Sequence, residues 1–84
     1  MKARFLFDGH EIVFFRGVFF AKLIIDGRDF DRIEGFKECQ MSSFDLTGTL
    51  EDGRKVLLQI KLGFPPDTAY LYIDDVLVET RKVI

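Results

Sequence analysis

The chain contains the same pattern of turns and apolar residues twice. Residues 5–15, FLFDGHEIVFF, align with residues 49–59, TLEDGRKVLLQ, at an offset of 44, and an Asp-Gly pair coincides in the two segments. Further along, residues 21–32, AKLIIDGRDFDR, align with residues 69–80, AYLYIDDVLVET, at an offset of 48. Because a chain of 84 residues has room for one small core, the repeat predicts two equivalent halves that share it.

Turn signals separate short apolar segments throughout both copies. Asp-Gly favours a two-residue hairpin because both residues tolerate the positive φ that a type I′ turn requires. At the fourth equivalent place Asp74-Asp75 stands instead, and we expect it to keep the same turn. The three Asp-Gly pairs are Asp8-Gly9, Asp26-Gly27 and Asp52-Gly53.

This spacing predicts an all-β fold: an antiparallel eight-stranded sandwich, or a small barrel, built from two repeated four-stranded meanders. Residues 1–84 form a single domain, in which copy one covers residues 3–33, a connection covers 34–44 and copy two covers 45–83. The strands are expected at residues 3–7, 10–15, 18–25, 28–33, 45–51, 54–62, 69–73 and 76–83.

Alternation in copy two indicates which side chains face inward. In RKVLLQIKL, residues 54–62, every second position from Val56 is apolar, and polar residues occupy most of the others. We carry this phase through both copies. The inward set is then Leu6, Ile12, Phe14, Phe19, Leu23, Ile25, Phe30, Leu46, Leu50, Val56, Leu58, Ile60, Leu62, Leu71, Ile73, Val76 and Val78.

The same phase leaves large apolar side chains on the outer face of copy one, whereas copy two shows mostly polar residues there. Such a cluster would expose about 300 to 500 Å² of apolar surface, close to the limit for a monomer in water. The predicted surface consists of Phe5, Phe7, Val13, Phe15, Phe20 and Ile24.

Three interpretations of this surface remain open. The connection between the copies covers it, with Ile33, Phe36, Met41 and Phe44 as the covering residues. Alternatively, it is a protein interface, either with a second copy of the chain or with another protein. Finally, the strand phase is wrong by one residue, which would exchange the two faces.

Composition excludes several classes of protein. Twelve Lys and Arg against fourteen Asp and Glu, with the signs interspersed, give no basic stripe for a nucleic acid. No run approaches the roughly 20 apolar residues of a membrane helix. Cys39 is the only cysteine, which excludes an internal disulfide. We expect a soluble, cytoplasmic protein that binds neither nucleic acid nor membrane.

No motif carries recognisable chemistry. His10 is the only histidine and has no nucleophile near it in the sequence. The acidic residues at 26–34 lack the glycine and closing glutamate of an EF-hand loop. Ser42 and Ser43 have no Gly-x-Ser-x-Gly setting. We therefore expect no enzyme activity, no cofactor and no metal.

The repeated units LIIDGRDF and LYIDDVLV each combine a strand, an Ile-Asp turn and a returning strand. In this they resemble the Fas apoptotic inhibitory molecule family, in which Val/Ile-Asp-Gly hairpins recur within compact all-β domains. The chain departs from that pattern in having no tryptophan, and in having Asp75 where the pattern has glycine. The resemblance implies a non-enzymatic interaction domain and transfers no catalytic residue.

We expect a small non-enzymatic protein-binding or assembly module that uses its apolar outer face, either as a homodimer or with another protein. Phe5, Phe7, Phe15 and Phe20 would be the anchors of that interface. The alternative is a carrier whose strands close into a barrel, with phenylalanines lining a cavity for a small apolar ligand.

Overall fold

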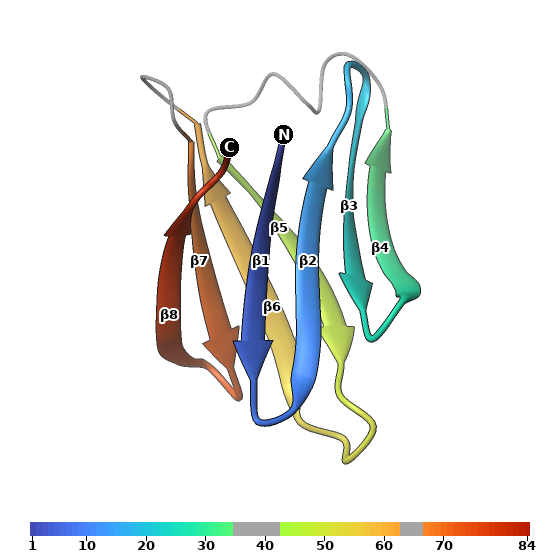
Figure 1. The fold of residues 1–84 in the computed structure, drawn as a ribbon, viewed down its shortest axis with the longest axis vertical. Coiled ribbons are helices and arrows are strands. Elements are labelled where there is room, and N and C mark those ends of the chain that lie inside the picture. The colour runs from blue at the N-terminus through green and yellow to red at the C-terminus, as the bar shows by residue number, and fades with distance from the viewer. Residues whose placement is uncertain (35–42, 63–66) are drawn as a thin grey trace.

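The computed structural model describes residues 1–34, 43–62 and 67–84, and this part of the chain contains eight antiparallel strands and no helix (Figure 1). They form two four-stranded sheets with the orders β1-β2-β3-β4 and β5-β6-β7-β8, so each copy is a meander, as predicted. The strands are β1 (Lys2–Phe7), β2 (His10–Arg16), β3 (Phe20–Ile25), β4 (Arg28–Glu34), β5 (Ser43–Thr49), β6 (Lys55–Lys61), β7 (Thr68–Ile73) and β8 (Val76–Lys82).

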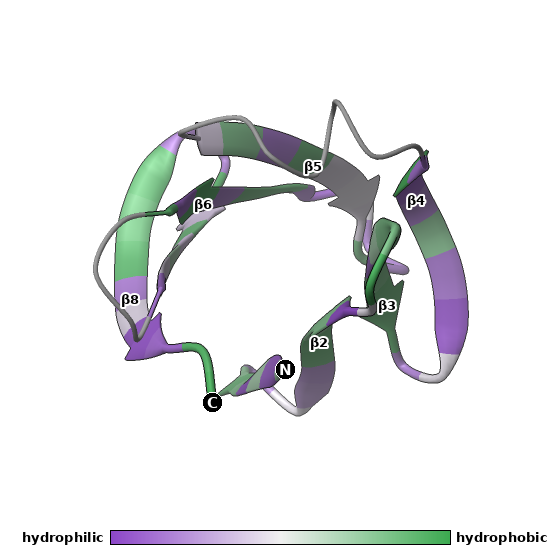
Figure 2. Ribbon diagram, turned by 90° about the horizontal axis from the view of Figure 1, so that it is seen from above, coloured by the Kyte–Doolittle hydropathy of each residue, from purple (hydrophilic) through white to green (hydrophobic). Residues whose placement is uncertain are grey.

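The two sheets curve around one shared interior, which Figure 2 shows from above. Apolar side chains from both sheets fill it, and most of the inward positions predicted from the repeat are confirmed. Leu62, also predicted inward, packs partly buried against this core. The confirmed buried residues are Ile12, Phe14, Leu23, Ile25, Leu46, Leu50, Val56, Leu58, Ile60, Leu71 and Ile73.

Three of the four expected two-residue turns are present. Asp8-Gly9 and Asp26-Gly27 have positive φ at both positions, which fits the type I′ prediction. Asp74-Asp75 takes the same form, with φ of 49° and 67°, although it lacks a glycine. The hairpin register confirms each turn, because the flanking residues pair directly with one another.

The turn at Asp52-Gly53 was predicted wrongly. Thr49 pairs with Lys55, so five residues, 50–54, connect β5 to β6 instead of two. Within this longer turn the N–H of Gly53 donates to the carbonyl of Leu50 at 2.9 Å. As a result, β1 and β5 align at an offset of 43 residues, while β2 and β6 keep the offset of 44.

This one-residue difference reverses the predicted faces of β1. Phe5 is fully buried and Ala3 is 4% exposed, whereas Leu6 is 65% exposed. The inward placement of Leu6 and the outward placement of Phe5 are therefore both wrong. A slip of one residue exchanges the two faces of a strand, and here it affects β1 alone.

A β-bulge accounts for two further errors, and it occurs at the same place in both copies. Leu23 pairs with Asp31 and the next residue of β3 pairs with Asp29, so Phe30 has no partner. In copy two the register shifts in the same way and leaves Val78 unpaired. Beyond the bulge the phase changes. Phe30 and Val78 are consequently exposed rather than inward. Val76, the first residue of β8 and the direct partner of Ile73, was also predicted to be buried and is 61% exposed.

Phe19 was also expected inside the core, and it is 56% exposed. The predicted strand at residues 18–25 begins too early, because β3 starts at Phe20. Val18 and Phe19 instead lie in the loop of the β2–β3 hairpin, which is closed by a bond from the N–H of Gly17 to the carbonyl of Phe20 at 2.9 Å.

Different contacts join the two sheets at their two edges. Between β1 and the end of the chain, the backbones of Lys2 and Ile84 exchange two hydrogen bonds, of 2.8 and 3.0 Å. Between β4 and β5, the Asp31 carboxylate accepts the N–H of Thr47 at 2.9 Å. The ring of Phe30 lies so close to Gly48 that a Cβ there would come within about 3.0 Å of Phe30 atoms.

Candidate protein-binding surface

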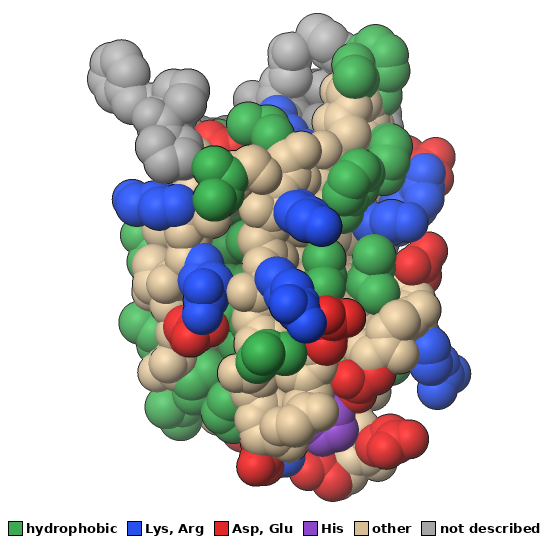
Figure 3. Space-filling view, in the orientation of Figure 1, with side chains coloured by type: hydrophobic (Ala, Val, Ile, Leu, Met, Phe, Trp, Pro, Cys, Tyr) green, Lys and Arg blue, Asp and Glu red, His purple; other side chains and the backbone are tan. Residues whose placement is uncertain are grey.

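The outer face of the first sheet carries four half-buried apolar side chains in one group, Val13, Phe15, Phe20 and Ile24. Val13 on β2 is the direct cross-strand partner of Ile24 on β3. The rings of Phe15 and Phe20 lie 5.8 Å apart. We call these four residues the apolar face. Hydrophobic side chains are visible along this side of the molecule in Figure 3.

Two of the six predicted surface residues do not belong to this group. Phe5 lies in the core with no exposed area, so its assignment to an interface is wrong. Phe7, at the end of β1, packs against the core, and the guanidinium of Arg54 lies 5.4 Å from its ring centre. Both corrections follow from the phase of β1.

Sequence reasoning missed the exposed tip of the β2–β3 hairpin. Val18 is 78% exposed and Phe19 is 56% exposed. Both directly precede Phe20, the member of the apolar face at the start of β3. The signal was present in the sequence, because Arg16-Gly17 marks the hairpin and the following residues are more typical of a loop than of a strand start. The tip extends the apolar area toward one end of the molecule.

Ion pairs border the apolar face. Arg4 pairs with Glu11, Lys22 with Asp29 at 3.8 Å, and Arg32 with Glu34. Exposed pairs of this kind contribute little stability, so a partner surface can rearrange them at small cost. The guanidinium of Arg32 also lies 4.6 Å from the centre of the Phe20 ring, where it covers part of the face.

The second sheet offers a different outer face at the equivalent positions. Gln59 stands where copy one has Phe15, and its cross-strand partner is Tyr70. Leu57 and Tyr72 form the pair that corresponds to Val13 and Ile24. Lys61 lies 5.3 Å from the ring centre of Tyr70. The contrast between the two sheets that the sequence predicts is therefore present, with fewer aromatic residues in copy one than expected.

Two of the four residues expected to cover the apolar face point elsewhere. Phe44 is 6% exposed within the core, with its ring 6.0 Å from that of Phe14, and Ile33 packs against the core. Their predicted covering role is wrong, because both lie on inward positions of their strands. Phe36 and Met41 lie outside the described residues, as does Cys39.

His10 and Asp26 join two hairpin turns at the opposite end of the molecule. His10 Nδ1 lies 2.7 Å from Asp26 Oδ2, and the N–H of Glu11 donates to Asp26 Oδ1 at 2.8 Å. The hydrogen bond from Asp26 raises the pKa of His10, and the same bond lowers the pKa of Asp26. Nearby, the side chain of Arg54 donates to Asp52 and lowers the pKa of that carboxyl.

In the described part of the chain, no three His, Cys, Asp or Glu side chains are grouped so that they would hold a metal ion. Nor does that part contain a helix long and apolar enough to cross a membrane.

The His10–Asp26 pair should make stability depend on pH. The pKa of His10 in the folded protein is raised above 6.5. The contribution of His10 to the free energy of unfolding is therefore complete below pH 6.5 and is lost as pH rises through the raised pKa. Asp26 acts in the opposite sense, and its contribution disappears as pH falls through its lowered pKa. Urea unfolding at about pH 6 and about pH 8.5 should give a lower free energy of unfolding at the higher pH.

His10→Gln is the control for this measurement, because the variant cannot titrate in that range. The difference between the two pH values should shrink in the variant. A histidine pKa at or below 6.5 in an NMR titration of the folded protein would contradict the prediction.

No family model matches the sequence, and no curated protein or solved structure matches it at a significant level. The resemblance to the Fas apoptotic inhibitory molecule family accordingly stays a prediction.

Proposed function

We propose that the chain is a small, non-enzymatic protein-binding or assembly module that buries its apolar face against a second copy of itself or another protein. The observation that carries the proposal is the difference between two equivalent sheets. Val13, Phe15, Phe20 and Ile24 stand together on one sheet, while the other sheet has Leu57, Gln59, Thr68 and Tyr72 at the matching places, so both phenylalanines are replaced by polar residues.

The composition of the surface supports a protein partner. Protein interfaces place aromatic and aliphatic anchors at the centre and polar groups at the rim. Phe15 and Phe20 occupy the centre here, and Arg4, Lys22 and Arg32, each paired with a carboxylate, form the rim. Both signs of charge are present in equal number in these pairs, which permits two copies to face each other without net repulsion.

Phe15→Lys tests this proposal, with Gln59→Lys as a matched control. The two positions are equivalent in the repeat and lie on the outer faces of different sheets. Light scattering at several protein concentrations measures mass, and thermal unfolding measures stability. We expect the unmodified protein to self-associate, Phe15→Lys to be a folded monomer, and Gln59→Lys to keep the mass of the unmodified protein.

One result would narrow the proposal to another protein, and a second would contradict the proposal itself. A monomeric mass for the unmodified protein at every concentration contradicts self-association and leaves only another protein as the partner. A large loss of thermal stability in Phe15→Lys, with no change in mass, would show that the chain itself already covers Phe15.

The alternative function, transport of a small apolar ligand in an internal cavity, has less support. The rings that would line such a cavity, Phe5 and Phe14, are fully buried among other core side chains. Phe14 contacts Phe44 from the opposite sheet, which places side chains where a ligand would have to lie.

A further inference from the structure

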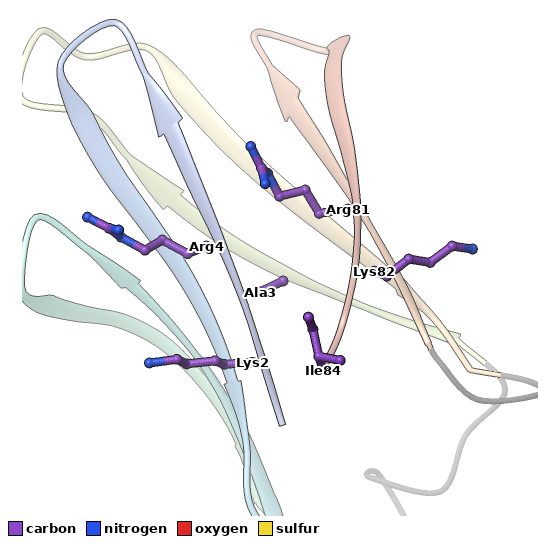
Figure 4. Close-up of a pocket in the computed structure, with 6 residues that line it drawn as sticks. All are labelled: Lys2, Ala3, Arg4, Arg81, Lys82 and Ile84. Atoms are coloured by element: carbon purple, nitrogen blue, oxygen red, sulfur yellow. The ribbon is translucent and has the colours of Figure 1, made fainter.

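Three cations stand in one row across the outer face of the first sheet. From β1 to β4, the successive cross-strand partners in this row are Lys2, Phe15, Lys22 and Arg32. Figure 4, a close-up of the start of β1, shows Lys2 and Arg4 pointing to one side of the strand. Ala3 points to the other side and is buried in the core, so Lys2 and Arg4 belong to the outer face. We call Lys2, Lys22 and Arg32 the cation row.

Carboxylates lie further along the same face, toward the opposite end of the sheet. The next row is Arg4, Val13, Ile24 and Asp29, and Glu11 lies one row beyond Val13. The carboxylate of Asp26 follows at the turn, where it accepts the N–H of Glu11 at 2.8 Å. Figure 3 shows Asp and Glu side chains gathered at this lower end, beside the single histidine. We call Glu11, Asp26 and Asp29 the acidic end of the face.

Two ion pairs on this face point in the same direction. Lys22 pairs with Asp29 at 3.8 Å, and Arg4 pairs with Glu11. In each pair the carboxylate lies one row further toward the acidic end than its cation. The third ion pair of the border is confined to the edge strand β4 and points the other way. The two aligned pairs flank the apolar face and give it a direction, positive at one end and negative at the other.

Two copies that bury the apolar face against each other can meet in two symmetric arrangements. If the two-fold axis runs along the strands, the cation row of one copy faces the cation row of the other. If the axis runs across the strands, the copies are antiparallel, and each cation row lies over the acidic end of the partner. Like charges that face each other oppose association, whereas opposite charges favour it. The antiparallel arrangement therefore pairs both ends of the face at once, with one set of residues.

We infer that the chain forms an antiparallel homodimer through its apolar face, in which the cation row of each copy meets the acidic end of the other. The inference rests on the proposed function, because it requires the apolar face to be an interface, and it identifies the partner as a second copy. Self-complementarity within one face is the property that a two-fold dimer requires.

Reversing the charges at one end tests the arrangement. The variant Lys2→Glu with Lys22→Glu, and the variant Glu11→Lys with Asp29→Lys, should each self-associate about tenfold more weakly, because like charges then meet. Combining all four substitutions inverts the face and should restore association to within about threefold of the unmodified protein. Light scattering at several protein concentrations gives each association constant, and circular dichroism confirms each fold.

The matched control is Lys55→Glu with Lys61→Glu, on β6 of the second sheet. It changes net charge as much as the variant of the cation row does, and it should self-associate within about twofold of the unmodified protein.

Mixing experiments distinguish the two arrangements further. Energy transfer between labelled chains should show no mixed dimers of the unmodified protein with the four-substitution variant, because like charges would meet in an antiparallel pair. The two double variants, mixed in equal amounts, should associate, since each supplies the charge that the other has lost.

Several outcomes would overturn the inference. If Phe15→Lys is monomeric but the four-substitution variant also stays dissociated, the apolar face is an interface and the antiparallel arrangement is wrong. Mixed dimers of the unmodified protein with the four-substitution variant, failure of the two double variants to associate, or equal weakening by the control would likewise contradict it. A monomeric unmodified protein at every concentration would overturn it too, while leaving the proposed function open for another protein as the partner.

Discussion

Replacing Phe5 with alanine should lower the free energy of unfolding by about 3 to 5 kcal/mol, the usual cost of removing a buried phenylalanine ring. Phe5 has no exposed area and lies opposite Ile12 at the centre of the shared interior. Its truncation removes apolar burial and leaves a cavity that neighbouring side chains fill only in part. Urea unfolding monitored by circular dichroism measures the change.

Leu6→Ala is the matched control, since the two residues are neighbours on the same strand and face opposite sides. Leu6 is 65% exposed, so its truncation should change the free energy of unfolding by about 0.5 kcal/mol or less. The reverse order of effects would mean that β1 has the phase predicted from the repeat, with Phe5 outside and Leu6 inside.

Replacing Arg16 with methionine should destabilise the protein by about 3 kcal/mol, because it leaves a buried carboxylate without its cation. Among the described residues, Asp67 is the one buried charged residue, and it is 6% exposed. Arg16 Nη1 lies 3.0 Å from Oδ2 of Asp67. The backbone carbonyl of Asp67 also accepts the N–H of Val83 at 2.8 Å. The pair joins the end of β2 in one sheet to the start of β7 in the other.

Two further variants separate the buried charge from the loss of side-chain packing. Adding Asp67→Asn to Arg16→Met removes the unpaired charge and should restore part of the lost stability. Arg4→Met breaks an exposed ion pair, with Glu11, and should cost about 0.2 to 1 kcal/mol. Equal effects of Arg16→Met and Arg4→Met in urea unfolding would contradict a special role for the buried pair.

The two-meander fold could be predicted because hairpin signals and alternation repeat in both copies. The phase of β1 could not, because the Asp-Gly pairs align in sequence while the turns they belong to differ in length. Asp8-Gly9 forms a two-residue turn, and Asp52-Gly53 lies inside a five-residue turn. The length of the second turn is evident only from the pairing of Thr49 with Lys55, and no local residue preference predicts it.

The bulges at Phe30 and Val78 were hidden for a related reason. Phe30 stands between two polar residues, and Val78 ends a run of three apolar residues that begins at Val76, so the pattern alone assigns both to the core. The extra residue appears only when β4 is paired with β3, and β8 with β7. A pattern within one strand carries no information about register against the next strand.

Of the candidate surface, the part on β2 and β3 could be predicted. Val13, Phe15, Phe20 and Ile24 follow from alternation once the inward side of these strands is known. The contact between the first strand and the end of β8 could not be predicted, because it depends on how the two sheets dock. Lys2 and Ile84 lie far apart in the sequence, and nothing local to either one indicates that their backbones bond to each other.

The meander order has a consequence for how the chain reaches its folded state. Every hydrogen-bonded ladder joins strands that follow each other in the sequence, so each can form by closing a short loop. Contacts between distant segments are the slow ones to form in all-β proteins. Here they are concentrated in the docking of one sheet on the other, so we expect that docking to be the step that sets the folding rate.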